Sequence, residues 1–89
     1  MVDLALLNWL MDGDYRIKVL RLLKTSPEIP TNISKKLVIH KSSLSRILND
    51  LYDKKLIEKI TSASRTITYK ISNLGEETLK EFDKKNGSK

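Results

Sequence analysis

The sequence contains no cysteine and only one histidine, His40, among its 89 residues. The absence of thiols excludes disulfide bonds, thiolate metal ligands and cysteine nucleophiles. A histidine cluster that binds a metal would have to be shared between chains, because one imidazole cannot form it alone. We therefore expect neither a metal nor a cofactor.

Long apolar runs are also absent, and none approaches the roughly 20 residues that a helix needs to cross a bilayer. The first residues lack the basic stretch of a secretory signal and include an early acid, Asp3. We therefore expect a cytoplasmic protein with no membrane partner.

The features that catalysis requires are missing as well. The three glycines, Gly13, Gly75 and Gly87, are isolated, so there is no glycine-rich loop to hold a phosphate group. The sequence has no nucleophile–base pair and no spaced carboxylate motif. A chain of 89 residues can bury only one modest core. We predict a single domain over 1–89 that is not an enzyme.

Charge, by contrast, is distributed unevenly. The net charge is +6, from 17 Lys and Arg against 11 Asp and Glu. Residues 1–34 and 71–89 each carry four bases and four acids, whereas residues 35–70 carry nine bases and three acids. The whole excess therefore lies in the middle third, and such a segregated basic region is typical of a protein that binds a polyanion. The alternative is a basic face that contacts only solvent.

Hydrophobic periodicity predicts five helices and two strands. The i, i+3, i+4, i+7 period of a helix face is clearest at Leu44, Ile47, Leu48 and Leu51. Apolar and polar residues alternate over 66–71, as in a strand with one buried face. The predicted elements are helices over 1–11, 15–25, 32–37 and 41–54, strands over 56–60 and 66–71, and a helix over 73–85.

Prolines and small polar residues mark the ends of these elements. Pro27 and Pro30 prevent the helix over 15–25 from continuing, and the two residues between them are expected to be extended. Residues suited to cap the following helices are Asp14, Thr31 and either Ser72 or Asn73.

The order of helix, short helix, turn, helix, hairpin and helix is that of a winged helix-turn-helix. The stretch 37–57, LVIHKSSLSRILNDLYDKKLI, resembles the recognition region of small prokaryotic winged-helix regulators, MarR-like and ArsR-like among them. The stretch 16–23 is similar to their opening helix, and 69–75 is similar to the segment that closes their wing. The resemblance implies a mainly α fold with a small β-hairpin (α+β), in which 15–72 is the winged-helix core and the N-terminal and C-terminal helices are additions.

The chain departs from this pattern at three points. Lys55 stands where the families usually have glycine, so the preceding helix must end without the residue best suited to a left-handed conformation. His40 stands at the usual Ser or Asp cap position, and we interpret it as a turn residue. The cysteine or histidine clusters of the metal-sensing members are missing, so metal sensing does not carry over.

The predicted recognition helix offers one face suited to DNA. When its apolar stripe turns inward, small polar residues and one arginine point outward. Such a face fits deep in a major groove about 12 Å wide, where Arg46 can pair with guanine and Asn49 with adenine. The predicted DNA-contacting residues of this region are Lys41, Ser42, Ser43, Ser45, Arg46 and Asn49.

Further contacts are predicted outside this helix. Lys35 and Lys36 are expected to bind phosphates, as are Lys59 and Lys70, and such contacts set register without reading sequence. Arg65 is the only charge in the predicted hairpin loop, and a lone arginine suits a narrow minor groove.

The first predicted helix, over 1–11, is apolar on nearly every side, and residues 1–12 are predicted to form the dimerisation segment. A monomer usually avoids exposing so large an apolar surface, so we predict a homodimer in which this helix meets its mate. Leu4, Leu7 and Met11 form one stripe, and Leu6 and Leu10 are expected to project elsewhere. The predicted interface residues are Leu4, Leu6, Leu7, Trp9, Leu10, Met11, Leu79 and Phe82.

The sequence therefore predicts a sequence-specific, double-stranded DNA-binding transcriptional regulator that acts as a homodimer. An architectural protein with little sequence preference is an alternative, because 13 lysines against four arginines favour point-charge phosphate contacts. A winged helix used only for protein–protein contact is a second alternative, and the basic middle third argues against it.

Overall fold

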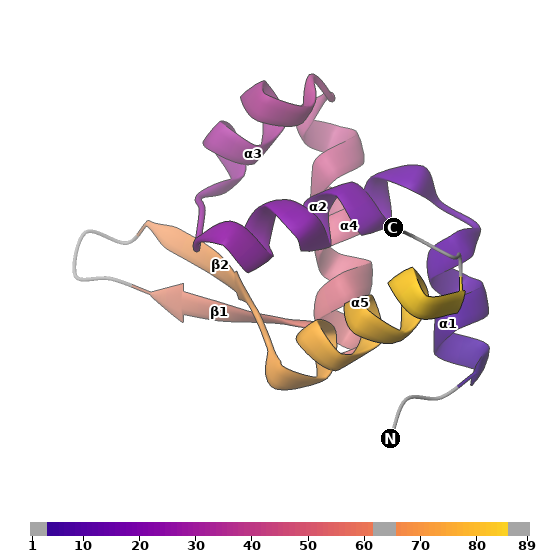
Figure 1. The fold of residues 1–89 in the computed structure, drawn as a ribbon. Coiled ribbons are helices and arrows are strands. Elements are labelled where there is room, and N and C mark those ends of the chain that lie inside the picture. Colours follow the sequence, from indigo (N-terminus) through magenta and orange to yellow (C-terminus); the bar gives the residue numbers. More distant parts are fainter. Residues whose placement is uncertain (1–3, 62–65, 86–89) are drawn as a thin grey trace.

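A computed structural model describes residues 4–61 and 66–85, and its order of elements is the one predicted (Figure 1). The helix-turn-helix is formed by α3 and α4, the hairpin extends to one side, and α1 and α5 contact each other at the far end from the hairpin loop. The fold is α+β, as predicted. The elements are α1 (Leu4–Met11), α2 (Asp14–Thr25), α3 (Pro30–Leu37), α4 (Lys41–Asp53), β1 (Ile57–Thr61), β2 (Ile67–Ile71) and α5 (Asn73–Lys85).

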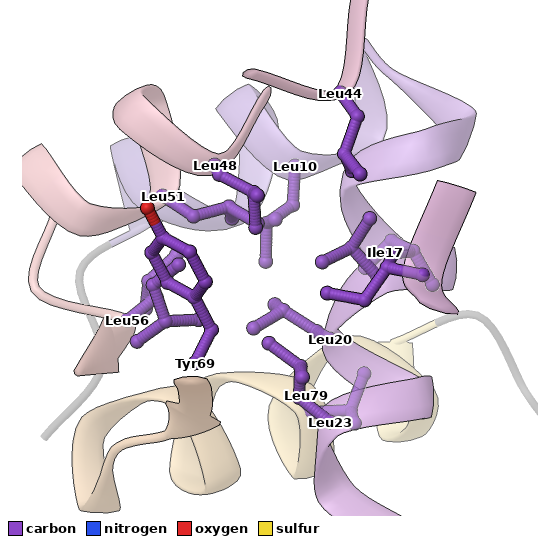
Figure 2. Close-up of a cluster of buried hydrophobic side chains, with 13 residues drawn as sticks. Leu10, Ile17, Leu20, Leu23, Leu44, Leu48, Leu51, Leu56, Tyr69 and Leu79 are labelled. Carbon is purple, nitrogen blue, oxygen red and sulfur yellow. The ribbon is translucent and has the colours of Figure 1, made fainter. Parts of the chain in front are cut away.

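The core lies where α2, α4 and α5 meet the base of the hairpin (Figure 2). The predicted stripe of α4 is buried at Leu44, Leu48 and Leu51, and Ile47 packs against the cluster from its edge. Burying each leucine favours folding by about 1.5–3 kcal/mol, so this stripe fixes which face of α4 is left for solvent. Fully buried side chains from the other elements include Leu10, Leu20, Leu23, Ile33, Leu56 and Leu79.

The hairpin begins one residue later than predicted, because β1 starts at Ile57. Its two strands pair in antiparallel register, with Ile57 opposite Ile71. The middle of β2 also pairs with the loop after α2: the Glu28 N–H donates to the Tyr69 carbonyl at 3.0 Å, and the Tyr69 N–H donates to the Glu28 carbonyl at 2.8 Å. The predicted extended piece between the prolines is therefore confirmed at Glu28, and it joins the helix-turn-helix to the wing.

Two of the predicted caps are wrong. Helix α2 includes Asp14, and its N-cap residue is Gly13. The Asp14 carboxylate lies in the first turn, where its negative charge interacts favourably with the positive end of the helix dipole. Helix α3 begins before Thr31, because Pro30 occupies its first turn and Ile29 is the N-cap. Proline suits this position because its φ is already helical and its missing N–H would have no intrahelical acceptor.

The cap of α5 is Ser72, one of the two predicted residues. Its Oγ accepts a hydrogen bond from the Gly75 N–H at 3.0 Å and donates one to the Lys55 carbonyl at 2.7 Å. At Gly75, a Cβ would lie 2.2 Å from the Leu56 carbonyl oxygen. The start of α5 therefore packs so closely on the backbone between α4 and β1 that no side chain fits at Gly75.

Helix α4 ends in a left-handed residue, even though that residue is not glycine. Lys55 has φ 65°, and the N–H groups that follow the helix close a Schellman motif: Leu56 donates to the Leu51 carbonyl at 3.0 Å and Lys55 to the Tyr52 carbonyl at 2.9 Å. The lysine thus adopts a conformation that glycine would adopt with less strain.

The turn between α3 and α4 also contains a non-glycine residue with positive φ, Val38, at φ 54°. Ser34 closes this turn, because its Oγ donates to the Ile39 carbonyl at 2.6 Å and its carbonyl accepts from the Ile39 N–H at 3.1 Å. His40 is the N-cap of α4 and makes no side-chain cap hydrogen bond, which agrees with its interpretation as a turn residue.

Helix α1 packs back on its own chain. Leu7 and Leu10 are buried there, while Leu4 and Met11 are more than half exposed. The prediction that Leu6 and Leu10 share an uncovered stripe is therefore wrong for Leu10, because α2 and α5 cover that side of α1. Within the described residues, no helix is long and apolar enough to cross a membrane.

Candidate nucleic-acid interface

The outer face of α4 carries the residues predicted to read DNA. Ser42, Ser45, Arg46 and Asn49 are exposed, as are Lys41 and Ser43 at the start of the helix. Burial of the leucine stripe on the opposite side forces this orientation. The structure gives these side chains no hydrogen bond or ion pair with another described residue. They are therefore free to donate to and accept from a ligand, and their contact with DNA stays a prediction.

Acids lie beside the second half of this face. Asp50 is half-buried and Asp53 is exposed, and both carboxylates would repel a phosphate backbone. A polyanion can therefore approach α4 most closely along its first two turns, where the described side chains are neutral or basic.

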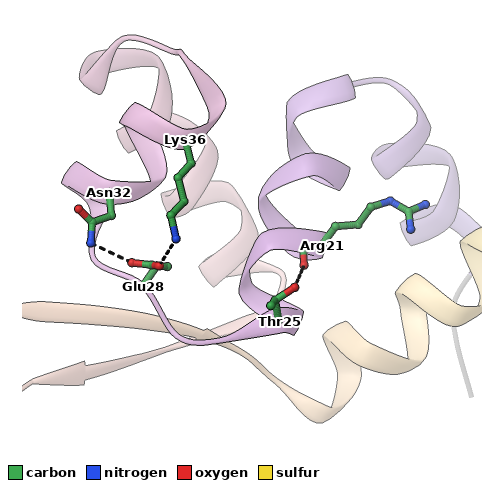
Figure 3. A network of polar contacts seen from close by, with 5 residues as sticks. All are labelled: Arg21, Thr25, Glu28, Asn32 and Lys36. Carbon is green, nitrogen blue, oxygen red and sulfur yellow. Dashed lines mark hydrogen bonds and ion pairs between the residues drawn. The ribbon is translucent and has the colours of Figure 1, made fainter.

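Helix α3 contributes two exposed lysines that differ in their surroundings. Lys35 has no ion pair with another described residue, whereas the Lys36 ammonium lies 2.5 Å from Glu28 Oε2 (Figure 3). Asn32 Nδ2 donates to the other oxygen of the same carboxylate at 3.1 Å. The hydrogen bond from Lys36, followed by that from Asn32, lowers the pKa of Glu28 below its ordinary value of 4.5. Sequence reasoning missed the role of Glu28, because it is eight residues from Lys36 and not on the same helix.

The predicted phosphate-binding lysines of the hairpin are also engaged. The Lys59 ammonium lies 4.4 Å from the centre of the Tyr52 ring, which joins β1 to the last turn of α4. The Lys70 ammonium lies 3.5 Å from Glu58 across the two strands. Arg65, predicted to enter a minor groove, lies outside the described residues.

Two open hollows flank these elements. One, of about 320 Å³, lies at the turn between α3 and α4 and is lined by Ser34, Lys35, Val38, Ile39 and His40. The other, of about 430 Å³, lies between the end of α4 and the base of the hairpin, beside Tyr52 and Glu58. Neither contains a metal-ligand set, and no group of three His, Cys, Asp or Glu that could hold an ion occurs within 4–61 and 66–85.

The predicted dimer residues separate into two groups. Leu7, Leu10 and Leu79 are 4%, 0% and 1% exposed, so they are core residues of the single chain, contrary to the prediction that places them at an interface. Leu6, Trp9 and Phe82 pack against the core and stay half-buried. Leu4 and Met11 are 56% and 53% exposed and are the apolar side chains of α1 that a second copy could cover.

Comparison with solved structures identifies the fold. The chain is similar to the transcriptional regulator BldR from Sulfolobus solfataricus, with a TM-score of 0.76 and 20% identity over 88% of this chain and 58% of that one. It is similar to the multiple antibiotic resistance repressor MarR, with a TM-score of 0.76 and 22% identity over 93% of this chain and 65% of that one. It is also similar to a mutant MarR from E. coli complexed with operator DNA, with a TM-score of 0.77 and 21% identity over 88% and 58% of the two chains.

These likenesses, at 20–22% identity, show that the chain has a winged helix-turn-helix fold. The chain spans only 58–65% of the length of these three proteins. No protein-family model matches the sequence, and no curated protein matches it closely enough to assign a relative.

Proposed function

We propose that this chain binds double-stranded DNA and regulates transcription, with α4 in the major groove and the hairpin beside the minor groove. The observation that carries the proposal is the exposed face of Ser42, Ser45, Arg46 and Asn49 on the second helix of a helix-turn-helix. In proteins of this architecture, the N-terminal residues of that helix contact base edges while the first helix crosses the backbone. The matched MarR in complex with operator DNA supports the same use of the fold here.

Each predicted residue then has a distinct chemical role. Arg46 presents a planar fork that pairs with two acceptors of guanine, and the Asn49 amide pairs with adenine. The serines donate to and accept from bases or phosphates at short range. Lys35 and Lys41 bind phosphates and place α4 in register, and Lys36 lies where it can make a weaker phosphate contact beside its ion pair with Glu28. Arg65 is proposed to enter the adjacent minor groove. None of these roles is catalytic.

We also propose that the chain acts as a two-fold dimer through the outer side of α1. Leu4 and Met11 supply its exposed apolar side chains, and the half-buried Leu6, Trp9 and Phe82 border them. A two-fold pair can place two recognition helices about 34 Å apart, one turn of duplex, and so read a palindrome. The cell compartment that fits this function is the cytoplasm.

The experiment that tests this function is selection of bound duplexes from a random pool. A palindromic consensus would support a dimeric sequence-specific regulator, and an asymmetric consensus would support specific binding by one chain. Tight binding without a consensus would instead support an architectural protein, which is the second candidate because of the high lysine content. Absence of duplex binding at low salt would contradict both.

A further inference from the structure

Glu28 is an acid placed inside the basic surface of the helix-turn-helix. Its carboxylate accepts hydrogen bonds from Lys36 and Asn32, both on α3 (Figure 3). The Glu28 side chain is only 13% exposed, whereas that of Lys36 is 51% exposed. The Lys36 ammonium therefore binds the largely buried Glu28 carboxylate and is still accessible to solvent.

The carboxylate and the lysine differ in how firmly they are held. Both backbone groups of Glu28 are bonded to Tyr69 in β2, so the sheet positions this residue whether or not Lys36 is present. Lys36 has a flexible stem of four methylene groups and no ion pair with any other described residue. Of the two partners, the lysine is the one that can turn to a different anion.

We propose that Glu28 is an affinity-determining residue that occupies Lys36 and thereby weakens the contact of α3 with a DNA phosphate. This inference rests on the proposed DNA-binding function. A phosphate oxygen and a carboxylate oxygen compete for the same ammonium donors, and α3 is the helix expected to cross the backbone. Lys35, next in sequence and exposed, has no such competitor among the described residues.

The expected consequence is weaker binding to all sequences alike. Phosphate contacts carry no sequence information. Pairing of Lys36 with Glu28 should therefore lower the affinity for every duplex and leave base recognition by α4 unchanged. The ratio between specific and nonspecific binding is thereby preserved while the protein dissociates faster from random DNA.

The test is the salt dependence of duplex binding by the intact chain and by Glu28→Gln. The glutamine keeps an oxygen that accepts from Asn32 but removes the charge that holds Lys36. One additional phosphate contact should steepen the slope of log K against log salt by about 0.9 and raise affinity roughly five- to tenfold at about 0.1 M salt. The selected duplex and a random duplex should gain equally.

Repeating the Glu28 substitution in a Lys36→Gln variant separates competition for Lys36 from a general effect of removing one negative charge. In a chain that already carries Lys36→Gln, the change Glu28→Gln should leave the salt slope unaltered. Asp83→Asn is the matched charge control, because Asp83 pairs with Arg21 between α5 and α2, away from the helix-turn-helix. Its slope should equal that of the intact chain.

Lys36→Gln alone gives an independent measurement that does not depend on changing Glu28. If Glu28 occupies Lys36, this variant should lose much less salt slope than Lys35→Gln. Equal losses for the two lysines, or an unchanged or weakened affinity in Glu28→Gln, would overturn the inference while duplex binding itself persists. Failure of the intact chain to bind any duplex would instead overturn the proposed function.

Discussion

The guanidinium of Arg16 lies over the ring of Trp9, with its central carbon 4.1 Å from the ring centre. The same guanidinium donates to the Trp9 carbonyl at 2.5 Å, and Lys54 lies 5.4 Å from the ring centre. One aromatic side chain of α1 is thus held by a cation from α2 and a cation from the end of α4. This arrangement adds to the burial of Leu7 and Leu10 in holding the N-terminal helix against the winged-helix core.

Replacement of Arg16 by alanine should destabilise the fold by about 1–2 kcal/mol, since a cation–π contact and a hydrogen bond are both lost. The emission of Trp9, the only tryptophan, should also change. Urea unfolding followed by fluorescence and circular dichroism would measure both effects. Arg21→Ala, which breaks only an exposed ion pair with Asp83, should cost less than about 1 kcal/mol. Equal costs for the two arginines would contradict this role of Arg16.

Lys55→Gly should stabilise the chain by about 0.5–1 kcal/mol. Lys55 has φ 65°, where a Cβ is strained and glycine is not, and its side chain is exposed. The gain offsets the larger conformational freedom of glycine in the unfolded chain. Thermal unfolding of the two proteins would measure it. A glycine two residues earlier, Asp53→Gly, should not stabilise, because the backbone is still in the right-handed helix at the last residue of α4.

Acid should reduce the stability that Glu28 contributes. Hydrogen bonds from Lys36 and Asn32 lower the pKa of Glu28, so its ionised form favours the folded chain. This contribution is complete above the ordinary pKa of the carboxyl group and is lost as the pH falls through the lowered value. The intact chain should therefore melt above Glu28→Gln at about pH 7, and the two melting temperatures should converge below about pH 4. A difference that stays constant with pH would show that the charge of Glu28 is not involved.

Arg46→Ala should relax sequence choice, while Lys35→Ala should weaken binding to every duplex. A bidentate arginine–guanine contact is worth about 1–3 kcal/mol of discrimination, whereas a phosphate contact is blind to sequence. Binding of each variant to the selected duplex and to single-base changes of it would separate the two effects. A uniform loss for both variants would show that Arg46 does not read a base.

Leu4→Glu combined with Met11→Glu should convert a dimer to a monomer without unfolding it. Both side chains are more than half exposed, so two charges there cost little in the single chain and much in a buried interface. Sedimentation of the intact chain and the variant at tens of micromolar would decide. Leu10→Glu is unsuitable for this purpose, because Leu10 is fully buried and its replacement would disrupt the core. An intact chain that sediments as a monomer would contradict the dimer and the expected palindrome with it.

Local patterns in the sequence predicted the elements of this fold and the outer face of α4. The reason is that helix periodicity and proline placement act over a few residues, so the leucines of 44–51 alone determine which side chains of α4 face outward. The sequence also located the whole charge excess in 35–70.

Only the tertiary structure decided the contacts between segments that lie apart in sequence. It places Glu28 beside β2, where the carboxylate meets Lys36, and it folds α1 onto α2 and α5 so that Leu10 is buried and Leu4 is not. An apolar helix has no intrinsic inner side, so the choice depends on which neighbours cover it. The same holds for the left-handed residues Val38, between α3 and α4, and Lys55, between α4 and β1, whose conformations depend on how the elements on either side pack.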